Sequence, residues 1–190
     1  MFARLFRRNP HGEAAHALYL AAVRQGRDPL FYRALGVPDT LDGRFEAISL
    51  QVWLLARRLR QAGPEQEELG RALAETFFAD MDQSLREIGA ADIGVGRRVK
   101  RMIEGFYGRV IAYDEALAAA AVGEGGALDE ALVRNLYATA KTSDPAQRQA
   151  VAGWLLAADR ALAAQPLAEI VAGRPAFPPL PAGEGAGAAA

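Results

Sequence analysis

Residues 42–62 read DGRFEAISLQVWLLARRLRQA, and this stretch decides the fold class. Its large apolar side chains recur at intervals of three and four residues, at Phe45, Ile48, Val52, Leu55 and Leu59. Because an α-helix repeats about every 3.6 residues, this spacing places the five side chains along one stripe. The stretch therefore predicts a helix that buries one side and ends at the Gly-Pro pair of residues 63–64.

The same helical period continues through most of the chain. We predict further helices over residues 11–25, 28–36, 65–88, 95–121 and 128–140, another from Asp144 and Pro145, and a last turn after Pro166. The helix at 28–36 has Asp28 as its N-cap, Pro29 at its first position and Gly36 after its end. Since no stretch alternates with the period of a β-strand, we expect an all-α, bundle-like fold of about six to eight helices.

A chain of 190 residues suits a single domain. We assign residues 11–172 to the helical domain and residues 1–10 to a basic amphipathic segment. Residues 173–190, GRPAFPPLPAGEGAGAAA, are rich in proline, glycine and alanine. Because such a composition offers little apolar surface to bury, we expect a disordered C-terminal tail.

Composition excludes several classes of chemistry. The formal net charge is −1, so no overall positive field attracts nucleic acid, and we expect no specific nucleic-acid readout. The chain has no cysteine, which excludes disulfides, thiol catalysis, cysteine-bound zinc and iron–sulfur clusters. The two histidines, His11 and His16, are five residues apart, a poor spacing for two ligands on one helical face. We therefore predict no catalytic residue, no metal site and no cofactor.

The first ten residues, MFARLFRRNP, form a small amphipathic pattern. Phe2, Leu5 and Phe6 share one side of a helix, and Arg4, Arg7 and Arg8 lie mostly opposite. One interpretation is an anchor on anionic lipid or on an apolar partner, and the other is a frayed terminus. No apolar run approaches the roughly 17–25 residues that span a bilayer. We expect a cytoplasmic protein, peripheral at most on the inner face of the cytoplasmic membrane.

Residues 77–110 contain two patterns that resemble catalytic motifs. Asp80 and Asp82 are two residues apart, so on a helix they point about 200° away from each other and cannot share a metal ion. Asp82 precedes Arg86 by four residues, the spacing of an ordinary helical ion pair. The Gly-Val-Gly of residues 94–96 lacks the strand and the third glycine of a dinucleotide site. We instead expect Asp92 to cap the next helix and these glycines to shape the bend before it.

The helix predicted over residues 95–121 has one apolar and one basic side. Its basic side chains are Arg97, Arg98, Lys100, Arg101 and Arg109. Gly105 and Gly108 lie on the same side, and an interior helical glycine costs about 1 kcal/mol relative to alanine. These glycines leave a shallow strip. Three interpretations of this strip are open. A neighbouring helix of the same fold fills it, or it is a docking groove for a partner chain or a membrane-proximal segment. The third is that it holds a phosphate ligand.

Two segments resemble the ubiquinol–cytochrome c chaperone family. They are RDPLFYRALGVPDTLDGRFEAISLQVWLLARRL at residues 27–59 and FADMDQSLREIGAADIGVGRRVKRMIEGFYGR at residues 78–109, and the likeness covers roughly residues 11–140. The matching positions are Phe31, Tyr32, Gly36, Pro38, Asp39, Gly43, Arg44, Phe45, Asp80, Met81, Asp82, Leu85, Arg86, Glu87, Gly89, Asp92, Phe106, Tyr107, Gly108 and Arg109. Gln51 departs from the family, since we expect histidine there in many relatives.

The resemblance implies a helical, non-enzymatic assembly chaperone. Mitochondrial members bind newly made cytochrome b, associate with the inner membrane and the ribosome, and work with a second small assembly factor. In a bacterium-like chain such as this one, the corresponding role is to chaperone cytochrome b at the cytoplasmic membrane for assembly into the cytochrome bc1 complex, which is respiratory complex III. Two alternatives are a peripheral membrane-binding module of unrelated purpose and a helical enzyme that acts on a lipid or a quinone.

We hypothesise a partner-binding surface on the two helices of residues 65–121. Its acidic part, Asp80, Asp82, Glu87 and Asp92, faces the basic loops of the client. Its basic part comprises Arg97, Arg98, Lys100, Arg101 and Arg109, with Arg86, Gly105 and Gly108 beside them. Of these, Arg97, Arg101 and Arg109 are expected to face lipid phosphates or ribosomal RNA. Charges of this kind set orientation, whereas buried aromatic side chains supply affinity. Tyr107 suits either the core or the partner, and Phe106 is predicted to be core.

Overall fold

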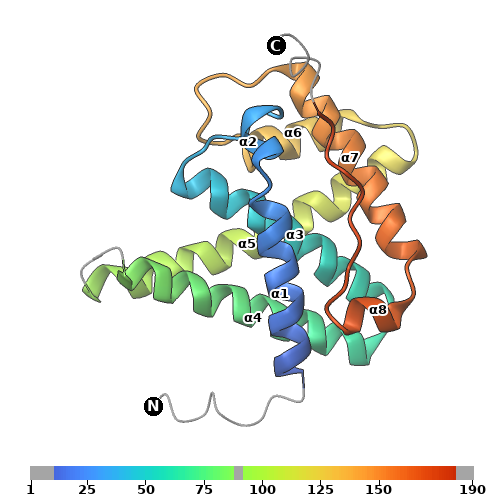
Figure 1. Cartoon of the computed structure of the whole chain (residues 1–190). Coiled ribbons are helices and arrows are strands. Elements are labelled where there is room, and N and C mark those ends of the chain that lie inside the picture. The colour runs from blue at the N-terminus through green and yellow to red at the C-terminus, as the bar shows by residue number, and fades with distance from the viewer. Residues whose placement is uncertain (1–10, 88–91, 183–190) are drawn as a thin grey trace, which may run out of the picture.

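The structure, a computed structural model, describes residues 11–87 and 92–182, apart from the side chains of residues 92–95 and 98. Over these residues it contains eight α-helices and no strand (Figure 1). The helices are α1 (Gly12–Gly26), α2 (Pro29–Arg33), α3 (Leu41–Gln61), α4 (Pro64–Glu87), α5 (Asp92–Ala121), α6 (Gly126–Arg134), α7 (Pro145–Ala164) and α8 (Leu167–Val171). The predicted all-α fold is confirmed.

Helix α3 lies at the centre of the bundle. It packs against α1, α4 and α7, and its Trp53 ring lies 5.0 Å from the ring of Tyr113 on α5. Residues outside the predicted stripe, such as Leu50 and Leu54, are as buried as those within it. Neighbours on several sides explain this result, because a helix that is covered all round has no solvent-facing side.

Helices α4 and α5 pack against each other, and the C-terminal part of α4 and the N-terminal part of α5 project from the rest of the bundle (Figure 1). Aromatic side chains join them to α3. The Phe77 ring lies 5.4 Å from that of Phe45 and 5.8 Å from that of Phe106, and Phe106 is almost fully buried, as predicted. Offset and tilted ring pairs of this kind add about 0.5–1.5 kcal/mol each beyond the area that they bury.

Two predicted helix boundaries are wrong. Helix α5 begins at Asp92 instead of near Val95, so Gly94 and Gly96 lie inside the helix and do not form a bend. Helix α6 ends at Arg134, well before residue 140. The Asn135 side chain donates to the Ala131 carbonyl at 2.8 Å, which offers the backbone an alternative to helical hydrogen bonding.

The prediction of a disordered tail is wrong for residues 173–182. This segment, which we call the strap, runs in an extended conformation along α7 (Figure 1), and its Leu180 is only 8% exposed. The hydrophobic core therefore extends beyond the predicted end of the domain at residue 172. Residues 183–190 and the amphipathic segment of residues 1–10 lie outside the described residues. In the part that is described, no helix has the length and apolar character needed to cross a membrane.

Candidate partner-binding site

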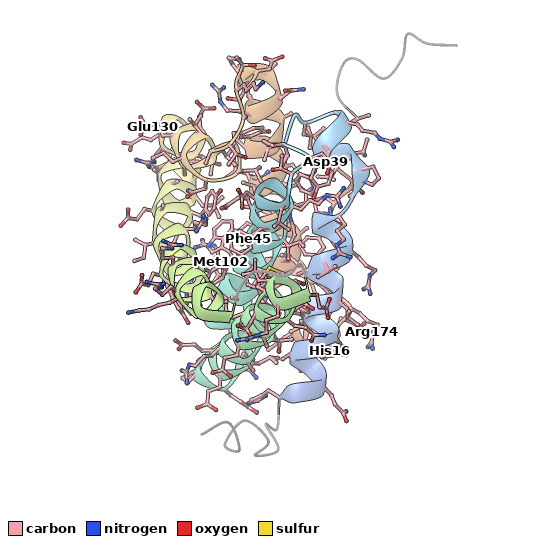
Figure 2. The ribbon with its side chains drawn as sticks, turned by 90° about the vertical axis from the view of Figure 1, so that its left-hand side faces the viewer. His16, Asp39, Phe45, Met102, Glu130 and Arg174 are labelled. Carbon is pink, nitrogen blue, oxygen red and sulfur yellow. The ribbon has the colours of Figure 1, made fainter. Side chains whose placement is uncertain are left out.

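An apolar cavity of about 170 Å³ opens where α3, α4 and α5 meet. Its apolar lining comes from Phe45 and Ile48 on α3, Met81 and Leu85 on α4, and Met102 on α5. Figure 2 shows Phe45 and Met102 together at this junction. A cavity of about 150 Å³ engineered into another protein holds one benzene molecule, so this space suits a single aromatic or branched aliphatic side chain.

Charged residues and one exposed leucine form the rim of the cavity. Arg27, Asp42 and Arg44 line it together with Leu41, which is 53% exposed. Arg44 donates to the Asp39 carboxylate at 2.6 Å, and this hydrogen bond lowers the pKa of Asp39. The site thus combines an apolar floor with a charged edge, the arrangement expected where a protein holds an apolar side chain and orients the chain that carries it.

Local backbone geometry sets the α3 side of the site. Gly36 ends the preceding turn with a φ of +69°, a conformation that favours glycine. The Thr40 hydroxyl accepts from the Gly43 N–H at 3.1 Å and caps α3. A β-carbon on Gly43 would overlap the carbonyl oxygen of Pro38. The family motif GVPDT…GRFE is therefore explained by close packing of the loop against the first turn of α3.

Phe45 is held in place by a ring on α4 and a charge on α5. It stacks on Phe77, and the Arg109 guanidinium lies 5.7 Å from its ring centre. Arg109 also binds Glu46 through two hydrogen bonds: Nε donates to Oε2 at 2.7 Å, and Nη2 donates to Oε1. Burial raises the pKa of Glu46, and the bond from Arg109 opposes this shift in part. Arg109 thus fastens α5 to α3 beside the cavity.

Arg109 was expected to face lipid or RNA, and the structure instead points it at the core. Gly105, one turn earlier, leaves room for the Arg109 side chain in this position. A β-carbon at Gly105 would lie 2.6 Å from Arg109 Nη1, which is too close. The sequence analysis did not predict the ion pair between Arg109 and Glu46. A glycine four residues before an arginine indicates that the arginine side chain has room to lie back along the helix.

The acidic residues of α4 have different surroundings. Asp80 accepts a hydrogen bond from the Tyr19 hydroxyl of α1 at 2.6 Å, so it joins two helices. Burial first, and then this bond, raises the pKa of Tyr19. Asp82 pairs with Arg86 at 2.7 Å, as predicted, and the exposed Glu87 accepts from Gln83. Asp82 and Glu87 are therefore accessible to a partner, whereas Asp80 has a structural contact.

On α5 the outer face is uncovered. Arg97, Lys100 and Arg101 are exposed, and Lys100 lies 3.7 Å from Glu104. Apart from the neighbouring backbone of α5 itself, no atom of the residues described lies within 4 Å of the place that a β-carbon on Gly108 would occupy. The idea that a neighbouring helix fills the glycine strip is therefore wrong at Gly108 for the residues that the structure describes. The side chains of Asp92 and Arg98 lie outside the described residues.

Two exposed apolar side chains border the glycine strip. Tyr107 is 51% exposed, although its ring packs edge-on against Phe106 at 5.8 Å. Ile111, one turn further on, is 59% exposed. Tyr107 thus combines a fixed ring position with an accessible face, as partner-binding aromatic residues commonly do.

A second polar cluster was also missed from the sequence. Asp114 on α5 accepts from the Trp53 indole at 3.0 Å and from Arg57 and Arg60 of α3 at 2.9 and 2.5 Å. Arg57 also donates to Asp159 of α7 at 2.9 Å. These contacts tie three helices together. Over the residues described, no group of three or more acidic, histidine or cysteine side chains is placed to hold a metal ion.

Comparisons with known proteins place these motifs in context. The model of the family described as ubiquinol-cytochrome C chaperone matches residues 33–177. The chain is 27% identical over 123 residues to ubiquinol-cytochrome-c reductase complex assembly factor 1 of Xenopus laevis, a match that covers 65% of this chain and 60% of that protein. The match to the factor of the same name from Mus musculus has 25% identity over 134 residues and covers 70% and 44%. The match thus spans less than two thirds of the length of each of these curated relatives.

A solved structure agrees with this result over nearly the whole chain. The crystal structure of the Cbp3 homolog from Brucella abortus superposes with a TM-score of 0.76 at 32% identity. The superposition covers 95% of this chain and 98% of that one. The matched family consists of chaperones and not of enzymes, in agreement with the expectation of a non-enzymatic protein. This chain belongs to the ubiquinol–cytochrome c chaperone family.

Proposed function

We propose that this protein is an assembly chaperone that binds newly made cytochrome b and supports its assembly into ubiquinol–cytochrome c reductase. The observation that carries the proposal is the apolar cavity between α3, α4 and α5, because Phe45, Met81 and Leu85, which line it, lie in the stretches that resemble the family. The names of the relatives from Xenopus laevis and Mus musculus, which are assembly factors of this complex, support the same role.

The cavity suits the chemistry of such a client. A membrane protein that has not yet assembled exposes apolar helix surfaces, and its cytoplasmic loops are rich in lysine and arginine. One apolar client side chain fits a space of about 170 Å³. Met81 and Met102 can adjust to its shape, because thioether side chains are flexible and polarisable. Asp42 on the rim would attract a basic loop beside it.

The remaining partners are proposals of the same kind. Asp82 and Glu87 would face basic client loops, while Arg97, Lys100 and Arg101 would face an anionic surface, either membrane lipid or ribosomal RNA. The open strip at Gly108 would receive a second small assembly factor. We also propose that the chain works as a peripheral protein at the inner face of the cytoplasmic membrane, with residues 1–10 as a lipid contact. Sedimentation with anionic vesicles, with and without these ten residues, tests the last point.

Site-specific photo-crosslinking tests the main proposal. A photo-reactive amino acid replaces Leu41 on the rim of the cavity. In a control chain it replaces Val122, which is 77% exposed in the turn directly after α5. Each full-length protein is present while radiolabelled cytochrome b is translated with membranes. We expect a crosslink to cytochrome b from position 41 and at most a trace from position 122. Equal yields from the two positions would contradict the proposed site. Normal accumulation of the cytochrome bc1 complex in a strain without this protein would contradict the function.

A further inference from the structure

The strap of residues 173–182 is bound to the domain in the manner of a peptide ligand. The Trp154 indole of α7 donates to the Pro178 carbonyl at 3.0 Å. The Gln165 side chain makes two hydrogen bonds to the strap backbone, one from its amide nitrogen to the Arg174 carbonyl at 2.8 Å and one to its oxygen from the Ala176 N–H at 2.9 Å. Side chains of the helical domain thus contact the main chain of the strap at Arg174, Ala176 and Pro178.

Apolar contacts complete the binding face. The Phe177 ring stacks on Trp154 with 6.4 Å between centres, and Trp154 in turn meets Phe31 edge-on at 5.6 Å. Leu180, near the end of the strap, is almost fully buried. We call this face, formed by Trp154 and Gln165, the strap groove. It is separate from the cavity between α3, α4 and α5, because the two share no lining residue.

Proline makes the strap an unusually stiff segment. Its prolines are Pro175, Pro178, Pro179 and Pro181. Each fixes its own φ near −65° and restricts the residue before it to extended conformations. Such a segment loses little conformational entropy when it docks, which is the property that proline-rich recognition peptides exploit.

A single glycine forms the turn that leads into the strap. Gly173 has a φ of +76°, and a β-carbon there would overlap that of Ala17 on α1. After this turn, the contacts in the groove involve carbonyl and N–H groups, which every polypeptide has, together with one aromatic and one aliphatic side chain. The groove can therefore accept another extended chain with the same features.

We propose that the strap groove is a binding site for extended, proline-containing segments of partner polypeptides, and that the strap is its resident ligand. A partner segment takes the place of the strap when the strap leaves. Because the strap is tethered beside the groove, its effective concentration is in the millimolar range, and a free peptide must compete with it. The site is independent of the proposed binding of cytochrome b.

The test uses the full-length chain and a labelled peptide, RPAFPPLPA, with the sequence of residues 174–182. In the double variant Phe177→Ser and Leu180→Ser the strap loses its two apolar contacts, while the groove keeps its own residues. By fluorescence anisotropy we expect this variant to bind the peptide at least about tenfold more tightly than the wild type, since the tethered competitor is weakened. Adding Gln165→Ala should reduce the affinity of this variant about fivefold or more, since two hydrogen bonds are lost. Adding Arg174→Ala, which removes an exposed ion pair with Glu169, should leave it unchanged.

The proposal is overturned if the folded double variant binds the peptide no better than the wild type, because the strap is then only a structural element. If that variant does not fold, the wild-type chain supplies the test. Excess peptide should accelerate hydrogen exchange at the Ala176 amide, which loses its bond to Gln165 when the strap is displaced. Exchange that is unchanged at millimolar peptide would equally overturn the proposal. Neither outcome depends on cytochrome b.

Discussion

Arg109 of α5 binds both carboxylate oxygens of Glu46 on α3, a residue 63 positions earlier in the chain. The pair links two of the motifs by which the chain resembles its family, GRFE and FYGR. Because the Arg109 guanidinium also lies against the ring of Phe45, it supports the wall of the apolar cavity. A residue that the sequence pattern placed on an outer surface thus holds the candidate site together from within.

Removal of Arg109 should destabilise the protein in a way that depends on pH. We expect Arg109→Met to lower the free energy of unfolding by about 3 kcal/mol at pH 7, because a buried carboxylate is left without its partner. The measurement is urea unfolding at pH 7 and again near pH 4.5.

The pH dependence follows from the pKa of Glu46. Burial already raises this pKa in the wild type, so the stability contribution of the carboxyl is full below its unfolded pKa and is lost as pH rises through the folded value. In the variant the pKa rises further, so protonation of Glu46 should remove most of the defect at low pH. Lys100→Ala, which breaks an exposed pair with Glu104, should cost less than about 0.5 kcal/mol at either pH. An Arg109→Met defect of equal size at both pH values would contradict this account.

Asp80 should act on stability more than on client capture. We expect Tyr19→Phe and Asp80→Asn each to lower the free energy of unfolding by about 1 kcal/mol. The double variant should lose less than their sum, since Tyr19→Phe removes and Asp80→Asn weakens the same hydrogen bond. Thermal unfolding gives the coupling, and crosslinking of cytochrome b from position 41 gives the capture. If Asp80→Asn abolishes capture without any loss of stability, Asp80 contacts the client directly, as first hypothesised.

A charge placed in the cavity should block the client. Met102→Glu puts a carboxylate against Phe45 and Met81, where an apolar client side chain cannot displace it cheaply. We expect crosslinking from position 41 to fall by about tenfold or more, the loss typical of a central binding residue. Ile111→Glu is the matched control, because it adds the same charge to an exposed position on the same helix. Equal losses in both variants would indicate a general charge effect and not a specific cavity.

Two helical glycines should respond to alanine in opposite ways. At Gly43 a β-carbon would overlap the Pro38 carbonyl, so Gly43→Ala should destabilise the protein by about 1–3 kcal/mol. At Gly108 the space is open, so Gly108→Ala should stabilise it by about 0.5–1 kcal/mol through helix propensity alone. Chemical unfolding measures both changes. If Gly108→Ala stabilises the protein yet weakens binding of a second assembly factor, the glycine serves the partner; if binding is unaffected, the proposed use of this strip is wrong.

Local interactions explain why much of the fold was predictable. The period of apolar residues identified most of the helices, and the predicted cap at Asp28 is present, whereas Asp92 is the first residue of α5 and not the residue before it. An aspartate also caps α7 at its predicted start. Asp28 accepts from the Leu30 N–H at 2.9 Å, and Asp144 accepts from the Ala146 N–H at 2.8 Å. Each of these contacts joins residues two apart, so the sequence alone contains all the information needed to infer it.

The candidate site could be predicted only in part. The motifs pointed to α3, α4 and α5, but the partners of Arg109 and Asp80 lie 63 and 61 residues away. Which side chains meet over such separations depends on how helices cross, and a helical period does not specify crossing angles or rotation. The same limit applies to the ion-pair cluster around Asp114.

The strap shows most clearly what the two levels contribute. The amino-acid sequence by itself determined most of the helices, the cap at Asp28, the resemblance to the family and the proline content of residues 173–182. Only the tertiary structure decided that this proline-rich segment is ordered. Its order depends on hydrogen bonds from the Trp154 indole and the Gln165 amide to its backbone, and on the Ala176 N–H that donates to Gln165. A chain segment with little entropy to lose still needs a surface to bind, and only folding of the helices creates that surface.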